Sequence, residues 1–321
     1  MNVDKNTDND YCIKELEDSE QNKYKYFYLN KNIPLNEKII KEMEKYNIVE
    51  FGDNFNQPVD NLPYNIQYLT FGESFNQPVD NLPTELECLT FGCNFNQSVD
   101  NLPSKLKYLF FGDNFNQSVN NLPTLNPEKG SIGLEQLYFG NDFNQPVDNL
   151  PSEIINLVFG VNFNQPVDNL PFQIQVLHFG ISFNQPVDNL PSKIENLSFN
   201  YKFNQPVDNL PSGLLILQFG VEFNQPVNNL PSNLQSLTFG WFFNQPCNNL
   251  PSEIKILTFG HEFNQPLGNN LPYELQELTL GLEFNQPFCD KLPSNLKYIN
   301  LSTYYDKSLY SIPSTVIITR I

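Results

Sequence analysis

The chain has 321 residues and carries 36 Asp and Glu against 18 Lys and Arg, for a formal net charge of −18. A surface this acidic repels phosphate backbones and anionic lipid headgroups, so neither nucleic acid nor a membrane is an expected partner. No stretch approaches the roughly 20 apolar residues of a membrane-spanning helix. No signal peptide is predicted, and five irregularly spaced cysteines argue against a secreted disulfide framework, so we expect a cytoplasmic location.

The N-terminal fifty residues divide into two expected parts. Residues 1–25 are polar and acidic, which predicts a disordered tail. Residues 26–50 are expected to form an N-terminal cap, because residues 35–46 carry apolar side chains at the spacing of a single helix. The exposed end of a repeat array needs a lid with one polar face, and this helix would supply it.

Residues 51–303 are internally repetitive. From Phe55 onward the unit reads F-N-Q-P-V-D-N-L-P-x-x-[IL]-x-x-L-x-F-G-x-x, with a period of 20 residues. An insertion around residues 125–131 and single extra residues near Gly268 and Phe288 interrupt the period. Residues 304–321 hold a degenerate copy and a last strand, which are expected to cap the other end. Self-similarity at this period indicates a solenoid in which each coil contacts only its neighbours.

Each repeat is expected to form one coil with a short strand after the Leu-Pro pair. The strand points three apolar residues inward, as at Ile66, Leu69 and Phe71, and strands of successive coils stack in parallel. The chain lacks alanine, the best helix former, so turns rather than helices should complete the coil. The sequence therefore predicts a right-handed, mainly β solenoid. Asn200 replaces the Gly that ends the strand in other copies, which indicates a left-handed backbone there.

Asparagine recurs in two columns of the repeat, and the expected role of both is structural. Coil corners leave backbone donors that need partners, and inward amide side chains stacked from coil to coil can supply donors and acceptors. Recurrence in every coil favours such a ladder over catalysis. The expected ladder residues include Asn56, Asn76, Asn96 and Asn164 in the FNQ triplet, and Asn61, Asn81 and Asn169 before Leu-Pro.

Two known repeat families resemble this unit. The segment LPxx[IL]xxLxF resembles the strand of the leucine-rich repeat, and the whole unit FNQPVDNLPxxLxxLxFG resembles the FNIP repeat. The FNIP family is known from social amoebae and from giant viruses of amoebae, and its repeats are treated as relatives of leucine-rich repeats. The resemblance spans residues 51–303 and implies a leucine-rich-repeat-like fold. The segment PVDNLP is too short to provide the helix that a leucine-rich repeat often carries.

Catalytic and metal sites find little support in the sequence. An Asp column at Asp60 and its equivalents places several carboxylates in like environments, which suits turn residues that accept local hydrogen bonds. The alternative is a Ca²⁺ ladder, although Asn120 replaces Asp in one copy without disturbing the pattern. Cys247 occupies a core Val position and is expected to be a small buried residue. His178, His261, Cys88 and Cys93 are expected to be surface residues without a catalytic role.

The positions that vary between coils carry the functional information. They become apolar from the fifth to the tenth coil, and contiguous apolar patches mark interaction sites. Aromatic residues are also typical anchors of binding hot spots. The patch is expected to comprise Ile155, Val158, Val161, Val176, Ile181, Tyr201, Leu215, Ile216, Val221, Trp241, Phe242 and Ile256.

We therefore expect non-catalytic binding of a protein partner through the strand face, with no cofactor and no metal. By family resemblance the partner would be a host protein, and the location the host cytoplasm if the chain is viral. Two alternatives stay open. One is a dimer through the same patch. The other is a substrate-receptor subunit of a ubiquitin ligase with an adaptor site in the N-terminal region, although the F-box domain found beside such repeats needs about three helices and residues 1–50 offer one.

Overall fold

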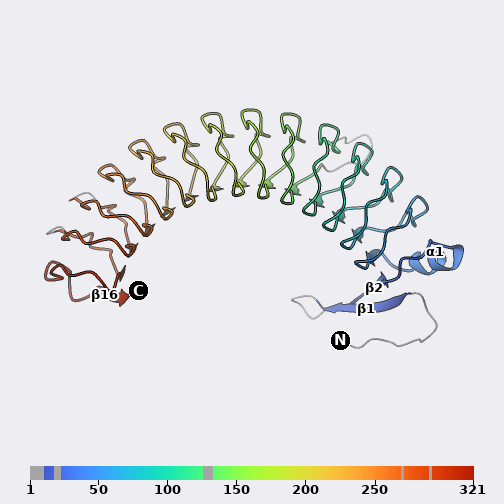
Figure 1. The fold of residues 1–321 in the computed structure, drawn as a ribbon, viewed down its shortest axis with the longest axis horizontal. Coiled ribbons are helices and arrows are strands. Elements are labelled where there is room, and N and C mark those ends of the chain that lie inside the picture. Colours follow the sequence, from blue (N-terminus) through green and yellow to red (C-terminus); the bar gives the residue numbers. More distant parts are fainter. Residues whose placement is uncertain (1–10, 18–22, 126–132, 269–270, 289–290) are drawn as a thin grey trace. The chain divides into compact units, whose positions relative to one another are not determined.

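The computed structural model describes residues 11–17, 23–125, 133–268, 271–288 and 291–321. The chain divides into two compact units, residues 1–163 and residues 164–321, which are taken separately below. Both units are built from coils that carry a strand on one side and turns on the other, so each is a mainly β solenoid (Figure 1).

The first unit begins with a hairpin and a helix before the regular coils start. β1 and β2 pair antiparallel, and from β2 onward each strand of this unit pairs in parallel with the next. Its elements are β1 (Cys12–Glu17), β2 (Lys23–Leu29), α1 (Glu37–Met43), β3 (Ile48–Phe51), β4 (Tyr68–Thr70), β5 (Cys88–Thr90), β6 (Tyr108–Phe110), β7 (Gln136–Tyr138) and β8 (Asn156–Val158).

In the described part of the second unit, the regular elements are parallel strands in chain order. Each strand pairs with its neighbours at a constant register, so that equivalent residues of successive coils lie side by side. Its elements are β9 (Val176–His178), β10 (Asn196–Ser198), β11 (Ile216–Gln218), β12 (Ser236–Thr238), β13 (Ile256–Thr258), β14 (Glu277–Thr279), β15 (Tyr298–Leu301) and β16 (Ile317–Arg320).

The expected disordered tail is wrong where the structure describes it, because β1 and the start of β2 lie within residues 1–25. The reason is the apolar content of β2. Phe27 and Leu29 are fully buried, and the ring of Phe27 stacks on Tyr11 with centroids 4.7 Å apart. The acidic composition of residues 1–25 as a whole gives no indication of this strand, which buries apolar side chains at the end of the array.

The single helix of the described chain, α1, is shorter than the predicted span 35–46. Asn36 caps it, since its Oδ1 accepts a hydrogen bond of 3.0 Å from the Ile39 backbone N–H. Ile39 and Met43 are buried on one face of the helix. The side chain of Asn65, in the coil that follows, donates to the Tyr46 carbonyl at 3.0 Å. These contacts are compatible with the predicted cap, which stays a prediction.

The core of each coil follows the sequence expectation. Ile66, Leu69 and Phe71 are almost completely buried. The two Phe residues that flank each Gly stack on one another, as Phe71 and Phe75 do at 3.8 Å between centroids. Phe75 also stacks on Phe95 of the next coil at 6.1 Å, so two columns of rings run through the first unit. Equivalent stacks occur in the second unit, and they hold the strands in register.

The Gly that follows most strands packs closely against the preceding coil, although Asn200 and Ser302 take this position in two coils. A Cβ at Gly240 would overlap the carbonyl group of Gly220 in the preceding coil, and the same holds for other members of the column. Among the described glycines, positive φ angles occur at Gly133 and Gly268, neither of which belongs to this column. The left-handed backbone inferred from Asn200 is therefore wrong for the column, and contact between coils explains its glycines.

The FNQ asparagines form a continuous hydrogen-bond ladder within each unit. In the first unit the Asn56 Oδ1 accepts from the Asn76 backbone N–H at 2.9 Å and from Gln77 Nε2 at 3.0 Å. In the second unit the Asn164 Oδ1 accepts from the Asn184 backbone N–H at 2.9 Å. Every rung satisfies a backbone donor at the coil corner, which would be costly to leave unpaired.

Residues 304–321 continue the coil with altered residues. Tyr305 takes the place of the FNQ Phe, and its ring stacks on Phe284 with centroids 6.0 Å apart. The Asp306 backbone N–H donates to Asn285 Oδ1 at 3.2 Å and so extends the ladder by one rung. β16 follows as the last strand of the second unit. Most of the insertion at 125–131, and residues 269–270 and 289–290, lie outside the described residues.

Candidate functional site

The strand face of the second unit is formed by the outward first and third residues of each strand. Its first column does not match the continuous apolar patch that the sequence predicts. Val176, Ile216 and Ile256 are separated by Asn196 and Ser236, which the strand register places between them. Ile216 and Ile256 remain 44% and 43% exposed, so this column alternates apolar and polar side chains.

The third-position column of the same face is polar. The ring of His178 lies in hydrogen-bond contact with the Ser198 hydroxyl, and burial lowers the pKa of His178 below its ordinary value. Hydroxyl and amide groups at these positions can donate and accept hydrogen bonds toward a bound chain. The column reads His178, Ser198, Gln218, Thr238, Thr258 and Thr279.

A continuous apolar row lies beside this face, in the turn just after the Gly. We call Ile181, Tyr201, Val221 and Trp241 the turn ridge. Consecutive turns are joined by backbone hydrogen bonds, such as Glu222 N–H to the Tyr201 carbonyl at 2.8 Å, so the ridge residues stack coil upon coil. Tyr201 and Trp241 are 42% and 49% exposed. The ridge therefore presents large apolar side chains in direct succession.

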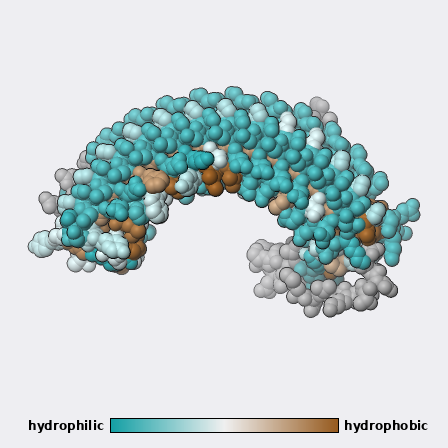
Figure 2. Space-filling model, in the orientation of Figure 1, coloured by the Kyte–Doolittle hydropathy of each residue, from teal (hydrophilic) through white to brown (hydrophobic). Residues whose placement is uncertain are grey.

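Phe242 widens the ridge at its end. It follows Trp241 in the same turn and is 39% exposed. His261 of the next coil stacks on Trp241 with ring centroids 4.2 Å apart and an interplanar angle of 6°. Figure 2 shows that the surface of the coils is mostly hydrophilic and that hydrophobic residues gather on the strand side.

The equivalent turn column of the first unit has a different character. It reads Asp53, Glu73, Cys93, Asp113, Asn141 and Val161, so half of its members are acidic and none is a large apolar residue before Val161. Three predicted patch residues, Ile155, Val158 and Val161, lie in this unit and are half-buried. The remaining members of the predicted patch belong to the second unit, where Leu215 and Val221 are half-buried.

A hollow of about 330 Å³ lies between the polar column and the turn ridge. Its lining includes the polar side chains Ser198, Gln218 and Thr238 and the ridge residue Val221. Asn200, which stands in the Gly column, also lines it. The hollow thus combines hydrogen-bonding groups with an apolar wall, which is the composition that recognises an inserted side chain.

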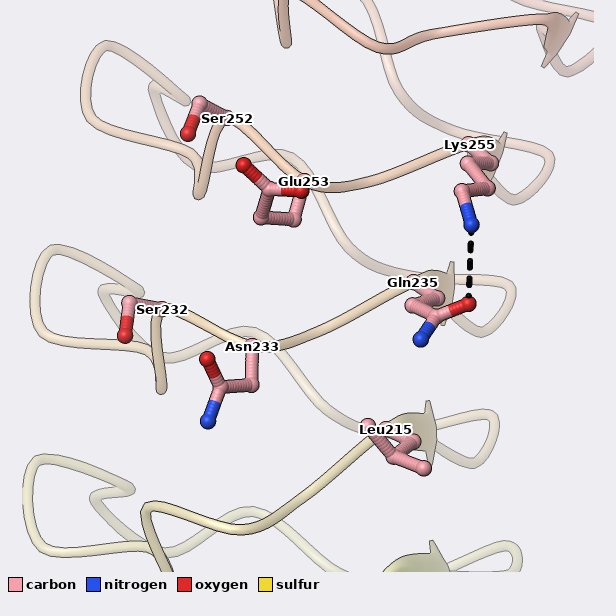
Figure 3. Close-up of a pocket in the computed structure, with 7 residues that line it drawn as sticks. All are labelled: Leu215, Ser232, Asn233, Gln235, Ser252, Glu253 and Lys255. Atoms are coloured by element: carbon pink, nitrogen blue, oxygen red, sulfur yellow. Dashed lines mark hydrogen bonds between the residues drawn. The ribbon is translucent and has the colours of Figure 1, made fainter.

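A second hollow, of about 430 Å³, lies at the start of β12 and β13 and is more polar (Figure 3). Across it, Lys255 Nζ donates to Gln235 Oε1 at 3.1 Å, and Leu215 closes one end. The side chains of Ser232, Asn233, Ser252 and Glu253 complete the lining. This hollow borders the first column of the strand face, so the face is flanked by a recess on each side.

The sequence of these coils identifies the family of the protein. The FNIP Repeat sequence model matches residues 55–94, 146–182, 183–222, 203–242 and 243–283, which is more than half of the chain. The chain belongs to the FNIP repeat family.

The chain was also compared with solved structures. The chain is similar to CroV588, a novel circular LRR protein from a giant virus, at 33% identity and a TM-score of 0.69. The alignment covers 92% of this chain and 52% of CroV588, so the chain spans about half the length of that relative. A leucine-rich repeat protein from Bacteroides ovatus aligns over 96% of this chain and 98% of its own, at 12% identity and a TM-score of 0.21. No curated protein matches the chain.

The Asp column of the FNIP repeats takes part in a second ladder. Asn81 Nδ2 donates to Asp60 Oδ1 of the preceding coil at 3.2 Å, and Asn209 Nδ2 donates to Asp188 Oδ1 at 3.0 Å. The second asparagine column is exposed, at Asn61 and Asn169 as elsewhere, so the expectation that its amides point inward is wrong. Within the described ranges, no group of three His, Cys, Asp or Glu side chains is placed to hold a metal ion.

The described cysteines are all free thiols. Cys93 lies between two acidic side chains, Glu73 and Asp113, and its Sγ lies 3.8 Å from Asp113 Oδ2. A hydrogen bond with Glu73, together with burial, raises the pKa of the Cys93 thiol. Cys247 is buried as the sequence predicts, and burial raises its pKa to about 12. Cys289 lies outside the described residues.

None of the helices in the described ranges has the length and apolar character needed to cross a membrane.

Sequence reasoning identified Tyr201, Val221 and Trp241 but missed how they are organised. It grouped all variable apolar residues into one patch. The strand register instead places them in different columns: a polar column at the third strand position, an alternating column at the first strand position, and the turn ridge after the Gly. It also left out the polar column and the acidic residues beside the ridge. An alignment of the repeats slot by slot contains the signal, because the slot after each Gly changes from acidic to apolar along the chain.

Proposed function

We propose that this FNIP repeat protein is a non-catalytic interaction scaffold that binds a protein partner through the strand face and turn ridge of its second unit. Leucine-rich-repeat-like solenoids are typical of such scaffolds. The observation that carries the proposal is the uninterrupted turn ridge, in which Tyr201 and Trp241 are more than two-fifths exposed. Contiguous exposed apolar side chains of this size mark interaction surfaces.

The surface is suited to binding because it is formed before the partner arrives. Backbone hydrogen bonds and ring stacks between coils hold the ridge residues in place. A rigid surface loses little conformational entropy on association, so more of the interaction energy appears as affinity. The polar column and the two hollows beside it supply hydrogen-bonding groups and recesses for specificity.

The test compares partner capture by the wild-type chain and by the variant Trp241→Glu in amoebal lysate, with Leu215→Glu as a second variant. Tyr273→Glu is the matched control, since Tyr273 is an aromatic residue of the same unit, 66% exposed and remote in sequence from the ridge. We expect Trp241→Glu to abolish capture and Tyr273→Glu to preserve it. Equal capture by all variants, each shown to be folded by circular dichroism, would overturn the proposal.

The partner is proposed to be a host protein and the location the host cytoplasm, as the family resemblance suggests. The ubiquitin-ligase alternative has no specific support, because the described part of residues 1–50 contains one helix, α1. Deletion of residues 1–50 separates the two ideas. Loss of folding indicates a cap, whereas a folded chain that keeps its partner and loses a ligase adaptor indicates a substrate receptor. A dimer through the ridge would appear as a mass that depends on Trp241 in light scattering.

A further inference from the structure

A second outward column runs along the turn ridge of the second unit. It consists of the second residue after each Gly position, namely Ser182, Lys202, Glu222, Phe242, Glu262 and Glu283. The backbone N–H groups of Phe242 and Glu262 donate to the carbonyls of Val221 and Trp241 at 3.0 and 2.9 Å. Adjacent members therefore lie in adjacent coils, and Phe242 lies between Glu222 and Glu262.

One member of this column is cationic: Lys202 lies one coil before Glu222, whereas Glu262 and Glu283 follow Phe242 with no cation beside them in the column. Among the described residues, Glu222, Glu262 and Glu283 form no ion pair. Elsewhere in the repeat, just before the strands of the first unit, charges do pair between coils: Lys105 Nζ pairs with Glu85 at 2.6 Å and Lys107 Nζ with Glu87 at 2.8 Å, each across one coil. The coils can therefore accommodate cross-coil ion pairs, and the carboxylates beside the ridge are left without one.

These carboxylates bracket an exposed aromatic pair. Trp241 and Phe242 are 49% and 39% exposed, and one face of the indole is already covered by His261. The faces of aromatic rings attract cations, and tryptophan does so most strongly. An ammonium or guanidinium group over this pair would also lie close to Glu222 and Glu262, so both contributions act on the same charge.

We propose that the end of the turn ridge at Trp241 and Phe242 receives a Lys or Arg side chain of the protein partner, between Glu222 and Glu262. This inference rests on the function proposed above and specifies the partner's chemistry. In the proposed complex, apolar side chains of the partner that flank its Lys or Arg pack along Val221 and Tyr201. The bound segment is therefore a basic and apolar one.

Charge selects this occupant over the others. A second copy of the chain would bring a net charge of −18 toward an acidic surface, and nucleic acid would bring phosphates. Both are repelled by unpaired carboxylates, whereas a basic segment is attracted and its association is accelerated.

The test uses peptides selected from a random twelve-residue phage library on the wild-type chain, with counter-selection on Trp241→Glu. Selected peptides are synthesised with a fluorescent label and titrated by polarisation. Trp241 is the single tryptophan of the chain, so its emission also reports binding at the ridge directly. We expect the selected sequences to be enriched in Lys or Arg beside Leu, Ile or Phe.

Charge-neutralising variants then separate the inference from the proposed function. Glu222→Gln and Glu262→Gln should each weaken binding by about two- to fivefold, and the double variant by about tenfold, as expected for partly exposed ion pairs. Glu195→Gln, which removes an exposed carboxylate of the same unit away from the aromatic pair, should have no effect. Replacement of the peptide's Lys or Arg by norleucine should weaken binding to a similar extent, and added NaCl should do so as well.

Selected peptides without a preference for Lys or Arg would overturn this inference, and so would unchanged binding by the double Gln variant. In either case, peptide binding that still depends on Trp241 would support the proposed function. Binding that is also indifferent to Trp241→Glu would overturn both. The failure of every peptide to bind the folded wild-type chain would likewise count against both.

Discussion

The indole ring of Trp241 lies flat against the imidazole of His261, with centroids 4.2 Å apart and an angle of 6° between the ring planes. The two residues occupy the same slot of adjacent coils, so the stack is a direct product of the repeat. It covers one face of the tryptophan and leaves the indole 49% exposed. The Nδ1 atom of His261 is buried without a hydrogen-bond partner.

Removal of the stacked imidazole should expose Trp241 to solvent. We expect His261→Ala to increase acrylamide quenching of Trp241 and to shift its emission to longer wavelength. The loss of stability should be small, about 0.5–1.5 kcal/mol for one aromatic pair. His178→Ala is the control, because His178 lies in the polar column and contacts Ser198. Equal quenching in wild type and His261→Ala would contradict the stack.

Close packing at the Gly column predicts that the cost of a Gly→Ala substitution depends strongly on its position. Gly240→Ala places a methyl group against the Gly220 carbonyl and should lower the free energy of unfolding by about 1–3 kcal/mol. Gly213→Ala in the same unit meets its nearest atom, the Ser192 carbonyl oxygen, at 3.3 Å and should cost much less. Urea denaturation followed by circular dichroism measures both. A similar midpoint for the two variants would refute the packing explanation.

The FNQ ladder predicts that its asparagines are needed for stability. Asn204 Oδ1 accepts from the Asn224 backbone N–H at 3.0 Å and from Gln225 Nε2 at 3.1 Å. Asn204→Ala leaves a part-buried backbone donor unpaired and should cost about 1–3 kcal/mol of unfolding free energy.

The matched control for that ladder is Asn209→Ala, from the exposed column of the same coil. Its amide donates one exposed hydrogen bond, to Asp188, so its loss should cost at most about 1 kcal/mol. Urea midpoints that reverse this order would show that the exposed ladder holds the coils together.

Cys93 should react slowly with alkylating reagents despite its position in a surface turn. Its pKa is raised, chiefly by the hydrogen bond with Glu73, so a smaller fraction is thiolate at a given pH. Glu73→Gln should lower that pKa and shift the pH profile of iodoacetamide labelling toward lower pH. Peptide mass spectrometry resolves Cys93 from buried Cys247, whose pKa of about 12 should keep it unlabelled in the folded chain. An unchanged profile in Glu73→Gln would contradict this account.

The Asp column should tolerate loss of its charge. Asp208 Oδ1 accepts from Asn229 Nδ2 at 2.9 Å, and Asn120 already accepts the equivalent bond from Asn149 at 3.3 Å. Asp208→Asn should therefore leave the melting temperature nearly unchanged, and Ca²⁺ should not raise it. Heat released on calorimetric titration with Ca²⁺, lost in Asp208→Asn, would show a cation ladder instead.

Much of the fold followed from the period of the sequence. Inward Leu69 and Phe71, the stacked Phe55 and Phe75 and the parallel strands recur because identical units can stack in only one register that keeps apolar side chains inside. The β1–β2 hairpin did not follow, because it lies outside the repeat and its acidic composition resembles that of a tail. The cause of the Gly column also escaped prediction, since contact between coils is not a local property.

The sequence by itself determined that this chain is a solenoid of FNIP repeats with a buried aromatic core, because a 20-residue unit must bury its apolar face against copies of itself. Only the tertiary structure decided which variable residues adjoin. Parallel pairing places residues twenty apart side by side, so it separates Ile216 from Ile256 by Ser236 and joins Tyr201, Val221 and Trp241 into one ridge. Which residues of adjacent coils lie side by side depends on the strand register, and the register is a property of the folded chain.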